Sequence, residues 1–195
     1  TKTSPYGTVE RPFNPGELVI GARGTFFARS IDAEVNLTTD CMVAASKHDG
    51  LSVIEVLVNC MIFNNGTHKA FAGDKEVRAE HTITLRHGEK MLFGKNMDKG
   101  LMLDNMKLKV VTVGENGVTL DDILVHDAHE KDTMVHVMLA SMKYPDYPVA
   151  LGVIRDVEAP TYEHEVARQI AEVQATAKIK NVDDLLNSGE TWEVE

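Results

Sequence analysis

The pattern of hydrophobic and polar positions predicts a strand–helix–strand unit near the start of the chain. Residues 25–29 (TFFAR) form a short apolar run, as in a buried strand. The next stretch has helical spacing and is expected to form a helix over 37–48, with Asn36 as its N-cap. Its apolar face consists of Leu37, Cys41, Ala44, Ala45 and His48. Residues 52–58 are apolar without alternation, which is typical of a parallel strand covered on both faces, so we expect a right-handed crossover.

The pattern of hydrophobic and polar residues changes after Gly66. Residues 82–125 are short strand-like runs between turn signals, with Asn116-Gly117 as the expected hairpin turn. We interpret this stretch as a β-rich excursion from the sheet. Before the first strand, a short helix is expected over 18–22.

The last third of the chain is predicted to be mostly helical. A helix should begin at an Asp132 cap and run to Met142, and a strand should follow over 148–156. Thr161 is the expected N-cap of a long amphipathic helix. A short helix then stops at Gly189, and the only tryptophan, Trp192, follows it.

Composition narrows the possible partners and compartment. The 195 residues include 20 basic and 30 acidic side chains, a net charge of −10, which disfavours nucleic acid and anionic membrane surfaces. No run approaches the roughly 18 apolar residues that span a membrane. Two cysteines do not make a disulfide framework, so a reducing cytoplasm is expected. The chain opens in turn-like sequence without a methionine, and we interpret it as a piece of a longer polypeptide.

Cys60 is the residue whose position raises a chemical question. It lies just past the carboxyl end of the predicted strand 52–58, where open parallel sheets bind ligands. From the residues alone, its thiol could be a nucleophile, a metal ligand or a buried structural group. Cys41 lies on the apolar face of the predicted helix and is interpreted as a core residue.

Other ligand-type residues give weaker signals. The HDAH stretch (126–129) could hold a metal but is interpreted as a polar turn before the Asp132 helix. The common phosphate-loop, dinucleotide, nucleophile-elbow, zinc-protease and C-x-x-C motifs do not occur in the sequence.

Several stretches in fixed order carry a resemblance to a known family. They are TKTSPYGTVERPFNP, TFFARS, AASKHDGLSVIEVLVNCMIFNNG, ILVHDAH, PVALGVIRDVEAPTYEHEV and SGETWEV. Over its whole length, the chain resembles the C-terminal part of the beta subunit of 2-oxoacid:ferredoxin oxidoreductases. The long form of that subunit in 2-oxoglutarate ferredoxin oxidoreductases is the most similar.

The resemblance implies an oxidative decarboxylase that makes an acyl-coenzyme A and reduces ferredoxin. Its implied cofactors are thiamine diphosphate, Mg²⁺ and one [4Fe–4S] cluster. Cys60 in CMIFN matches the family's fourth cluster ligand, and Cys41 matches no ligand. In that family, the other three thiolates and the thiamine and Mg²⁺ motif belong to the N-terminal part of the subunit. The resemblance therefore implies two partners, that N-terminal part and an alpha subunit. 2-Oxoglutarate is the favoured substrate, and pyruvate is the alternative.

The implied fold is α/β, the C-terminal part of a thiamine-diphosphate-binding α/β/α domain with a β-rich excursion and a helical tail. Its expected division is 1–65 for the cofactor-binding part, 66–130 for the excursion and 131–195 for the closing helix, strand and tail. A second hypothesis is a non-catalytic interaction module of the same ancestry.

Overall fold

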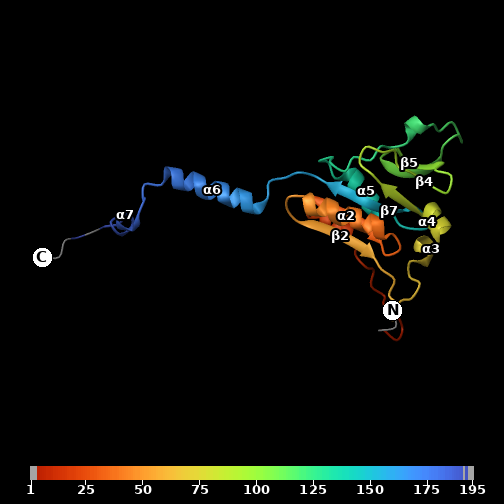
Figure 1. Cartoon of the computed structure of the whole chain (residues 1–195), viewed down its shortest axis with the longest axis horizontal. Coiled ribbons are helices and arrows are strands. Elements are labelled where there is room, and N and C mark those ends of the chain that lie inside the picture. The colour runs from red at the N-terminus through yellow and green to blue at the C-terminus, as the bar shows by residue number, and fades with distance from the viewer. Residues whose placement is uncertain (1–3, 191, 193–195) are drawn as a thin grey trace. The chain divides into compact units, whose positions relative to one another are not determined.

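The computed structural model describes residues 4–190 and 192, and these form two compact units that meet in the sequence between Ala159 and Pro160 (Figure 1). The first unit is built on a mixed four-stranded sheet in the order β2-β1-β7-β3 (Figure 1). Its strands are β1 (Phe26–Ile31), β2 (Ser52–Leu57), β3 (Thr82–Leu85) and β7 (Val149–Asp156). The chain therefore has the predicted α/β class.

The predicted strand–helix–strand unit is confirmed, because β1 and β2 pair in parallel with Phe26 opposite Ser52. β7 runs antiparallel to β1 and parallel to β3. The expectation that strand 52–58 is covered on both faces holds in part, since Val53 packs against the core on one face of the sheet and Ile54 against the core on the other. β2 lies at the edge of the sheet, and all six of its residues are only half buried.

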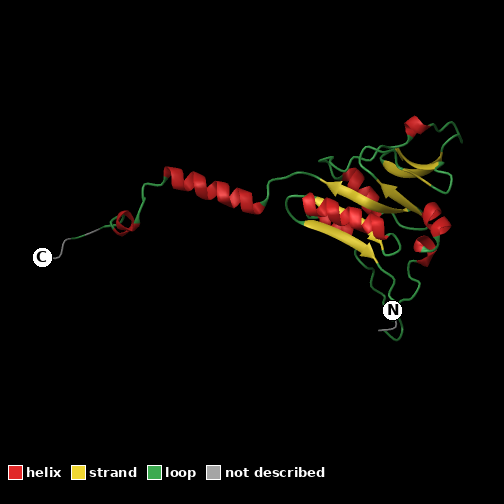
Figure 2. Ribbon diagram, in the orientation of Figure 1, coloured by secondary structure: helices red, strands yellow, loops and turns green. Residues whose placement is uncertain are grey.

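Helices cover both faces of the sheet. α2 (Val35–Lys47) packs on one face, where Phe26, Ala28 and Cys41 form a small core (Figure 2). α1 (Pro15–Gly21) and α5 (Met134–Ser141) pack on the other, where Phe27 joins the main core. Adjacent Phe26 and Phe27 serve opposite faces because successive strand side chains alternate.

Three helices begin at other residues than the sequence predicted. α1 begins earlier than expected because Asn14 caps it, accepting from the N–H of Gly16 at 3.0 Å, and Pro15 fits the first turn. α2 begins after Glu34, without a side-chain cap, and not at Asn36. α5 has Thr133 and not Asp132 at its N-cap position, although Oδ1 of Asp132 accepts from the N–H of Met134.

A second, three-stranded sheet in the order β4-β5-β6 has no strand pairing with the main one, although its Phe93, Leu101 and Leu108 share the main core. It contains β4 (Leu92–Phe93), β5 (Lys99–Asp104) and β6 (Lys107–Thr112), and it follows the short helices α3 (Lys69–Ala72) and α4 (Lys75–His81). The 3-10 turn η1 (Leu120–Asp122) comes after it. Of the short strands in this stretch, β4, β5 and β6 thus form a sheet of their own, whereas β3 belongs to the main sheet.

The hairpin turn is also not where the sequence placed it. Asn105 and Met106 join β5 to β6, with φ of 48° and 62°. Asn116 and Gly117 have positive φ as well, but their turn connects no pair of strands. Asn-Gly marks a tight turn through its backbone preference, and only neighbouring strands make such a turn a hairpin.

The second unit contains α6 (Tyr162–Thr176) and α7 (Val182–Leu186). Thr161 caps α6 as predicted, accepting from the N–H of His164. Ile170 and Val173 of its apolar stripe stay exposed, as does Trp192. α7 ends at Leu186, before Gly189. Among the described residues, no helix combines the length and apolar character needed to cross a membrane.

Candidate functional site

Cys60 lies on a loop that is fixed to the carboxyl ends of β1 and β2. The N–H of Asn59 donates to Oδ2 of Asp32, which directly follows β1, at 2.9 Å. The side chain of Asn59 then holds the far end of the loop, accepting from the N–H of Gly66 at 2.7 Å and donating to Asn65 at 3.0 Å. One hydrogen bond thus ties the start of the loop to the end of β1, and two more close the loop on Asn59.

The loop itself is a tight turn around the sulfur of Cys60. The N–H of Asn64 donates to the Cys60 carbonyl at 3.0 Å, and the Asn64 side chain donates to Thr67 at 2.9 Å. The main-chain N–H of Phe63 is the largest cause that lowers the pKa of the Cys60 thiol. Slight burial opposes this shift, and the N–H groups of Ile62 and Asn64 add to it. The turn therefore favours a thiolate, the form that binds metals.

A polar pocket of about 250 Å³ adjoins this loop. It lies at the carboxyl ends of the two parallel strands, the usual place for ligands in open α/β sheets. Sequence reasoning missed its lining, although the position of Asp32 and Asn59 directly after strands was a usable signal. Its polar lining residues are Asp32, Asn59, Asn65, His68 and Lys69.

Cys41 has the opposite environment and is confirmed as a core residue. It is 1% exposed and packs beside Phe26 and Ala28, with Leu37 and Ala45 from its own helix. Burial, followed by the nearby Asp40 carboxylate, raises the pKa of its thiol to about 11. Both cysteines are free.

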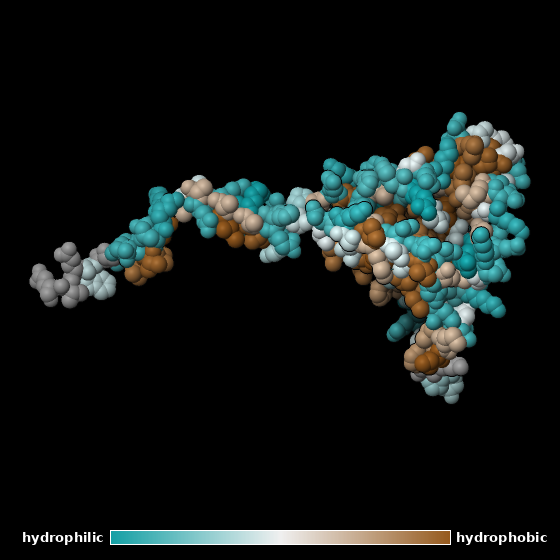
Figure 3. All heavy atoms as spheres, in the orientation of Figure 1, coloured by the Kyte–Doolittle hydropathy of each residue, from teal (hydrophilic) through white to brown (hydrophobic). Residues whose placement is uncertain are grey.

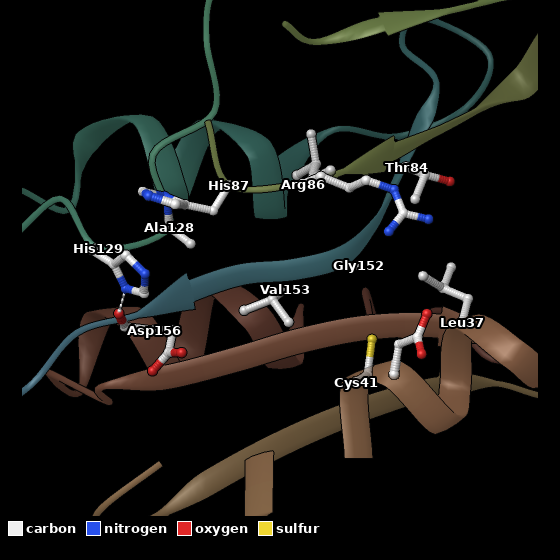
Figure 4. A pocket seen from close by; sticks show the side chains of 12 residues that line it. Leu37, Cys41, Thr84, Arg86, His87, Ala128, His129, Gly152, Val153 and Asp156 are labelled. Carbon is white, nitrogen blue, oxygen red and sulfur yellow. Dashed lines mark hydrogen bonds between the residues drawn. The ribbon is translucent and has the colours of Figure 1, made fainter. Parts of the chain in front are cut away.

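A second pocket, of about 280 Å³, lies between α2 and strands β7 and β3 (Figure 4). Cys41 and Leu37 point into one end of it, and His87 and His129 stand at the other. Nδ1 of His129 lies 2.5 Å from the carbonyl oxygen of Asp156. This pocket does not include Cys60.

The HDAH stretch splits between surface and core. His129 is exposed, whereas His126 is 1% exposed and its Nε2 lies 2.8 Å from the Val153 carbonyl. His136, also buried, lies with Nδ1 2.8 Å from the guanidinium of Arg155. Burial is the main cause that lowers the pKa of both His126 and His136. These histidines join α5 and the 126–129 turn to β7.

Three comparisons with known proteins bear on the identity of the chain. No family model matches it. It is 32% identical over 198 residues to the 2-oxoglutarate oxidoreductase subunit KorB of Mycobacterium tuberculosis. This alignment covers all of the present chain and 52% of that protein. The chain is KorB-like. Over 60 residues, 31% of the chain, it is 42% identical to the 2-oxoglutarate synthase subunit KorB of Archaeoglobus fulgidus and covers 22% of that protein.

A solved structure shows the same fold as this KorB-like chain. It is the 2-oxoglutarate:ferredoxin oxidoreductase from Magnetococcus marinus with 2-oxoglutarate, coenzyme A and succinyl-CoA bound. The match has a TM-score of 0.58 and 15% identity, and it covers 97% of this chain and 48% of that one. The KorB-like chain thus spans about half the length of the Mycobacterium tuberculosis and Magnetococcus marinus proteins that it matches.

The KorB-like chain can offer one thiolate to a cluster, and no more. Cys60 is exposed, fixed in place and faced by main-chain N–H groups, so it suits an iron–sulfur ligand. Among residues 4–190 and 192, no three His, Cys, Asp or Glu side chains are grouped as a metal site would require.

Proposed function

We propose that this chain is part of the beta subunit of a 2-oxoglutarate:ferredoxin oxidoreductase and that Cys60 is one thiolate ligand of its [4Fe–4S] cluster. The observation that carries the proposal is the placement of Cys60. Its thiol is exposed at the carboxyl end of β2, on a loop that Asp32 and Asn59 fix to the sheet. The whole-length similarity to a KorB subunit supports the choice of reaction.

The residues of this chain would position and tune that ligand. The hydrogen bonds of Asn59 hold the loop, and the N–H groups of Phe63, Ile62 and Asn64 stabilise negative charge on the sulfur. Hydrogen bonds to the sulfurs are one of the features that set the potential of such a cluster. When bound, a [4Fe–4S] cluster accepts and passes on single electrons.

The remaining cofactors and partners follow from the same proposal. Thiamine diphosphate and Mg²⁺ would be held by the N-terminal part of the same subunit, and an alpha subunit would complete the active site. Coenzyme A and ferredoxin would be the other reactants, with 2-oxoglutarate as the oxoacid and pyruvate as the alternative. Two free cysteines without a disulfide fit a reducing cytoplasm.

The test is Cys60→Ala in the complete enzyme, with Cys41→Ala as the matched control. Cys60→Ala should lower the iron content and abolish ferredoxin reduction, because one of four thiolates is missing. Carbon dioxide should still be released in a first turnover, since bound thiamine diphosphate supplies the electron sink for decarboxylation. Cys41→Ala should retain both the iron and ferredoxin reduction.

Full iron content in Cys60→Ala would overturn the ligand assignment. A wild-type assembly that is colourless and releases no carbon dioxide from any 2-oxoacid would instead favour the second hypothesis, a non-catalytic interaction module. Comparing initial rates with 2-oxoglutarate and pyruvate in the same preparation decides between the two substrates.

A further inference from the structure

The pocket between α2 and strands β7 and β3 shares no lining residue with the polar pocket beside Cys60. It measures about 280 Å³ and is lined by apolar and charged side chains together. On the face of the molecule that carries α2, hydrophobic side chains are interspersed with hydrophilic ones (Figure 3). The pocket therefore does not lie in a continuous apolar patch of the kind that marks a protein interface. Its small size and mixed lining suit a small polar molecule instead.

Two opposite charges line this pocket without pairing. Arg86 directly follows β3 and Asp40 lies on α2, and both side chains are exposed. Among the described residues, neither of them belongs to an ion pair. Asp156, the other carboxylate in the lining, is already paired with His48, with Oδ1 2.8 Å from Nδ1. A ligand that carries one carboxylate and one ammonium group would therefore complement Arg86 and Asp40.

An apolar wall separates these charges from the far end of the pocket. Leu37 and Cys41 point into the pocket from α2, and Val153 lies between them and His129 (Figure 4). Burial raises the pKa of the Cys41 thiol to about 11, so this side chain stays neutral and adds no charge to the wall. The methylene groups of a ligand can pack on such a surface.

The far end of the pocket offers a hydrogen-bond acceptor. The rings of His87 and His129 stand there with their centroids 4.3 Å apart. Nδ1 of His129 lies 2.5 Å from the carbonyl oxygen of Asp156 and carries a proton, because a carbonyl oxygen can only accept. In the neutral ring, Nε2 is then an acceptor, and Figure 4 shows this second nitrogen turned toward the pocket. It would bind an amide NH₂ group and would have nothing to donate to a carboxylate.

We propose that this pocket binds a free α-amino acid whose side chain ends in an amide, as in L-glutamine. The α-carboxylate would bind Arg86, the α-ammonium group would bind Asp40, and the side-chain amide would donate to Nε2 of His129. The methylene groups between them would pack on Cys41 and Val153. This assignment does not depend on the reaction proposed for Cys60.

Calorimetric titration of the complete enzyme with L-glutamine tests the two charged contacts. At about pH 8, where an imidazole is ordinarily neutral, binding should saturate with a Kd of about 1 mM or lower. Arg86→Gln and Asp40→Asn should each weaken binding at least about tenfold, because each removes one charge-assisted contact. No saturable binding by the wild-type enzyme would overturn the proposal.

The matched controls are Arg168→Gln and Asp49→Asn. Both remove an exposed charge of the same type that does not line the pocket, so both should leave the Kd for L-glutamine unchanged. If these controls weaken binding as much as Arg86→Gln and Asp40→Asn do, the effect is one of net charge and the proposal is wrong.

The choice between two ligands tests the amide contact separately. L-Glutamate should bind at least about tenfold more weakly than L-glutamine, since its side chain brings no donor to His129. His129→Phe removes the acceptor, so the ratio of the two Kd values should fall toward one. Equal affinity for the two amino acids in the wild-type enzyme, or an unchanged ratio in His129→Phe, would contradict the assignment. These titrations need no turnover, so they can fail or succeed whatever the iron content of Cys60→Ala.

Discussion

Cys41 and Cys60 flank the same strand, yet their surroundings differ in almost every physical respect. Cys41 is enclosed between α2 and β1, and burial raises the pKa of its thiol. Cys60 is exposed on the loop after β2, where main-chain N–H groups lower the pKa of its thiol. The difference shows that the role of a cysteine depends on which groups surround the sulfur, since a buried neutral thiol packs like a small apolar side chain.

The largest expected contrast comes from placing a charge at each position. Cys41→Asp should lower the free energy of unfolding by about 4 kcal/mol, because it leaves an unpaired carboxylate in the core. Cys60→Asp should change it by no more than about 0.5 kcal/mol, since that side chain stays in water. Urea denaturation of the two variants measures both values. Equal losses would mean that the two environments have been wrongly distinguished.

Thiol reactivity should separate the two cysteines next. In the chain without a cluster, iodoacetamide should modify Cys60 at least about 100-fold faster than Cys41, because Cys41 reacts only after local opening. The rate at Cys60 should rise with pH through a midpoint below that of an ordinary exposed cysteine, since its pKa is lowered. Peptide mapping by mass spectrometry follows both sites, and a free cysteine-containing peptide provides the reference midpoint.

A milder substitution tests whether Cys41 acts only through packing. Cys41→Ala should lower the free energy of unfolding by about 1 kcal/mol, at the low end of changes that leave a core cavity. Cys60→Ala should leave the stability of the isolated chain unchanged within about 0.5 kcal/mol. Thermal and urea unfolding provide the measurements. A loss at Cys60 as large as that at Cys41 would contradict the contrast in packing.

Lowering the pH should reduce the stability of the packing around Cys41, and this is the smallest of the four predicted effects. His126 contacts Val153, which packs against the Cys41 core, and burial lowers the pKa values of His126 and His136. The unfolded chain therefore binds protons more readily, so the free energy of unfolding should fall as pH drops below about 6.5 toward the folded pKa values. Urea midpoints at pH 7.5 and 5.5 measure this fall.

His126→Gln should reduce that dependence on pH, because one buried titrating group is removed. His164→Gln is the matched control, since His164 is exposed on α6. Stability that stays constant or rises between pH 7.5 and 5.5 in the wild-type chain would contradict the prediction.

Local signals in the sequence predicted the elements that depend on nearby residues. The apolar runs identified β1, β2 and β7, and the spacing of Leu37, Cys41 and Ala45 identified the buried face of α2. Thr161 was found as a cap because its hydroxyl binds an N–H three residues away. The position of Cys60 after a strand followed from the same kind of signal, and its role as a ligand stays a prediction.

Pairing between distant segments was predicted less well. Thr82–Leu85 is a short strand whose membership of the main sheet depends on β7, more than sixty residues later. The polar pocket beside Cys60 combines Asp32, Asn59 and Lys69, which lie on separate segments. Neither the pairing nor the pocket leaves a periodic pattern within one segment.

The sequence by itself determined the α/β class, the crossover from β1 to β2 and the resemblance that singled out Cys60, because each depends on short-range order along the chain. Only the tertiary structure decided the antiparallel entry of β7, the open edge of β2 and the opposite environments of the two thiols. The physical reason is that burial and strand pairing are properties of segments brought together in space. A run such as SVIEVL has the same pattern whether its second neighbour is another strand of the chain or a different polypeptide.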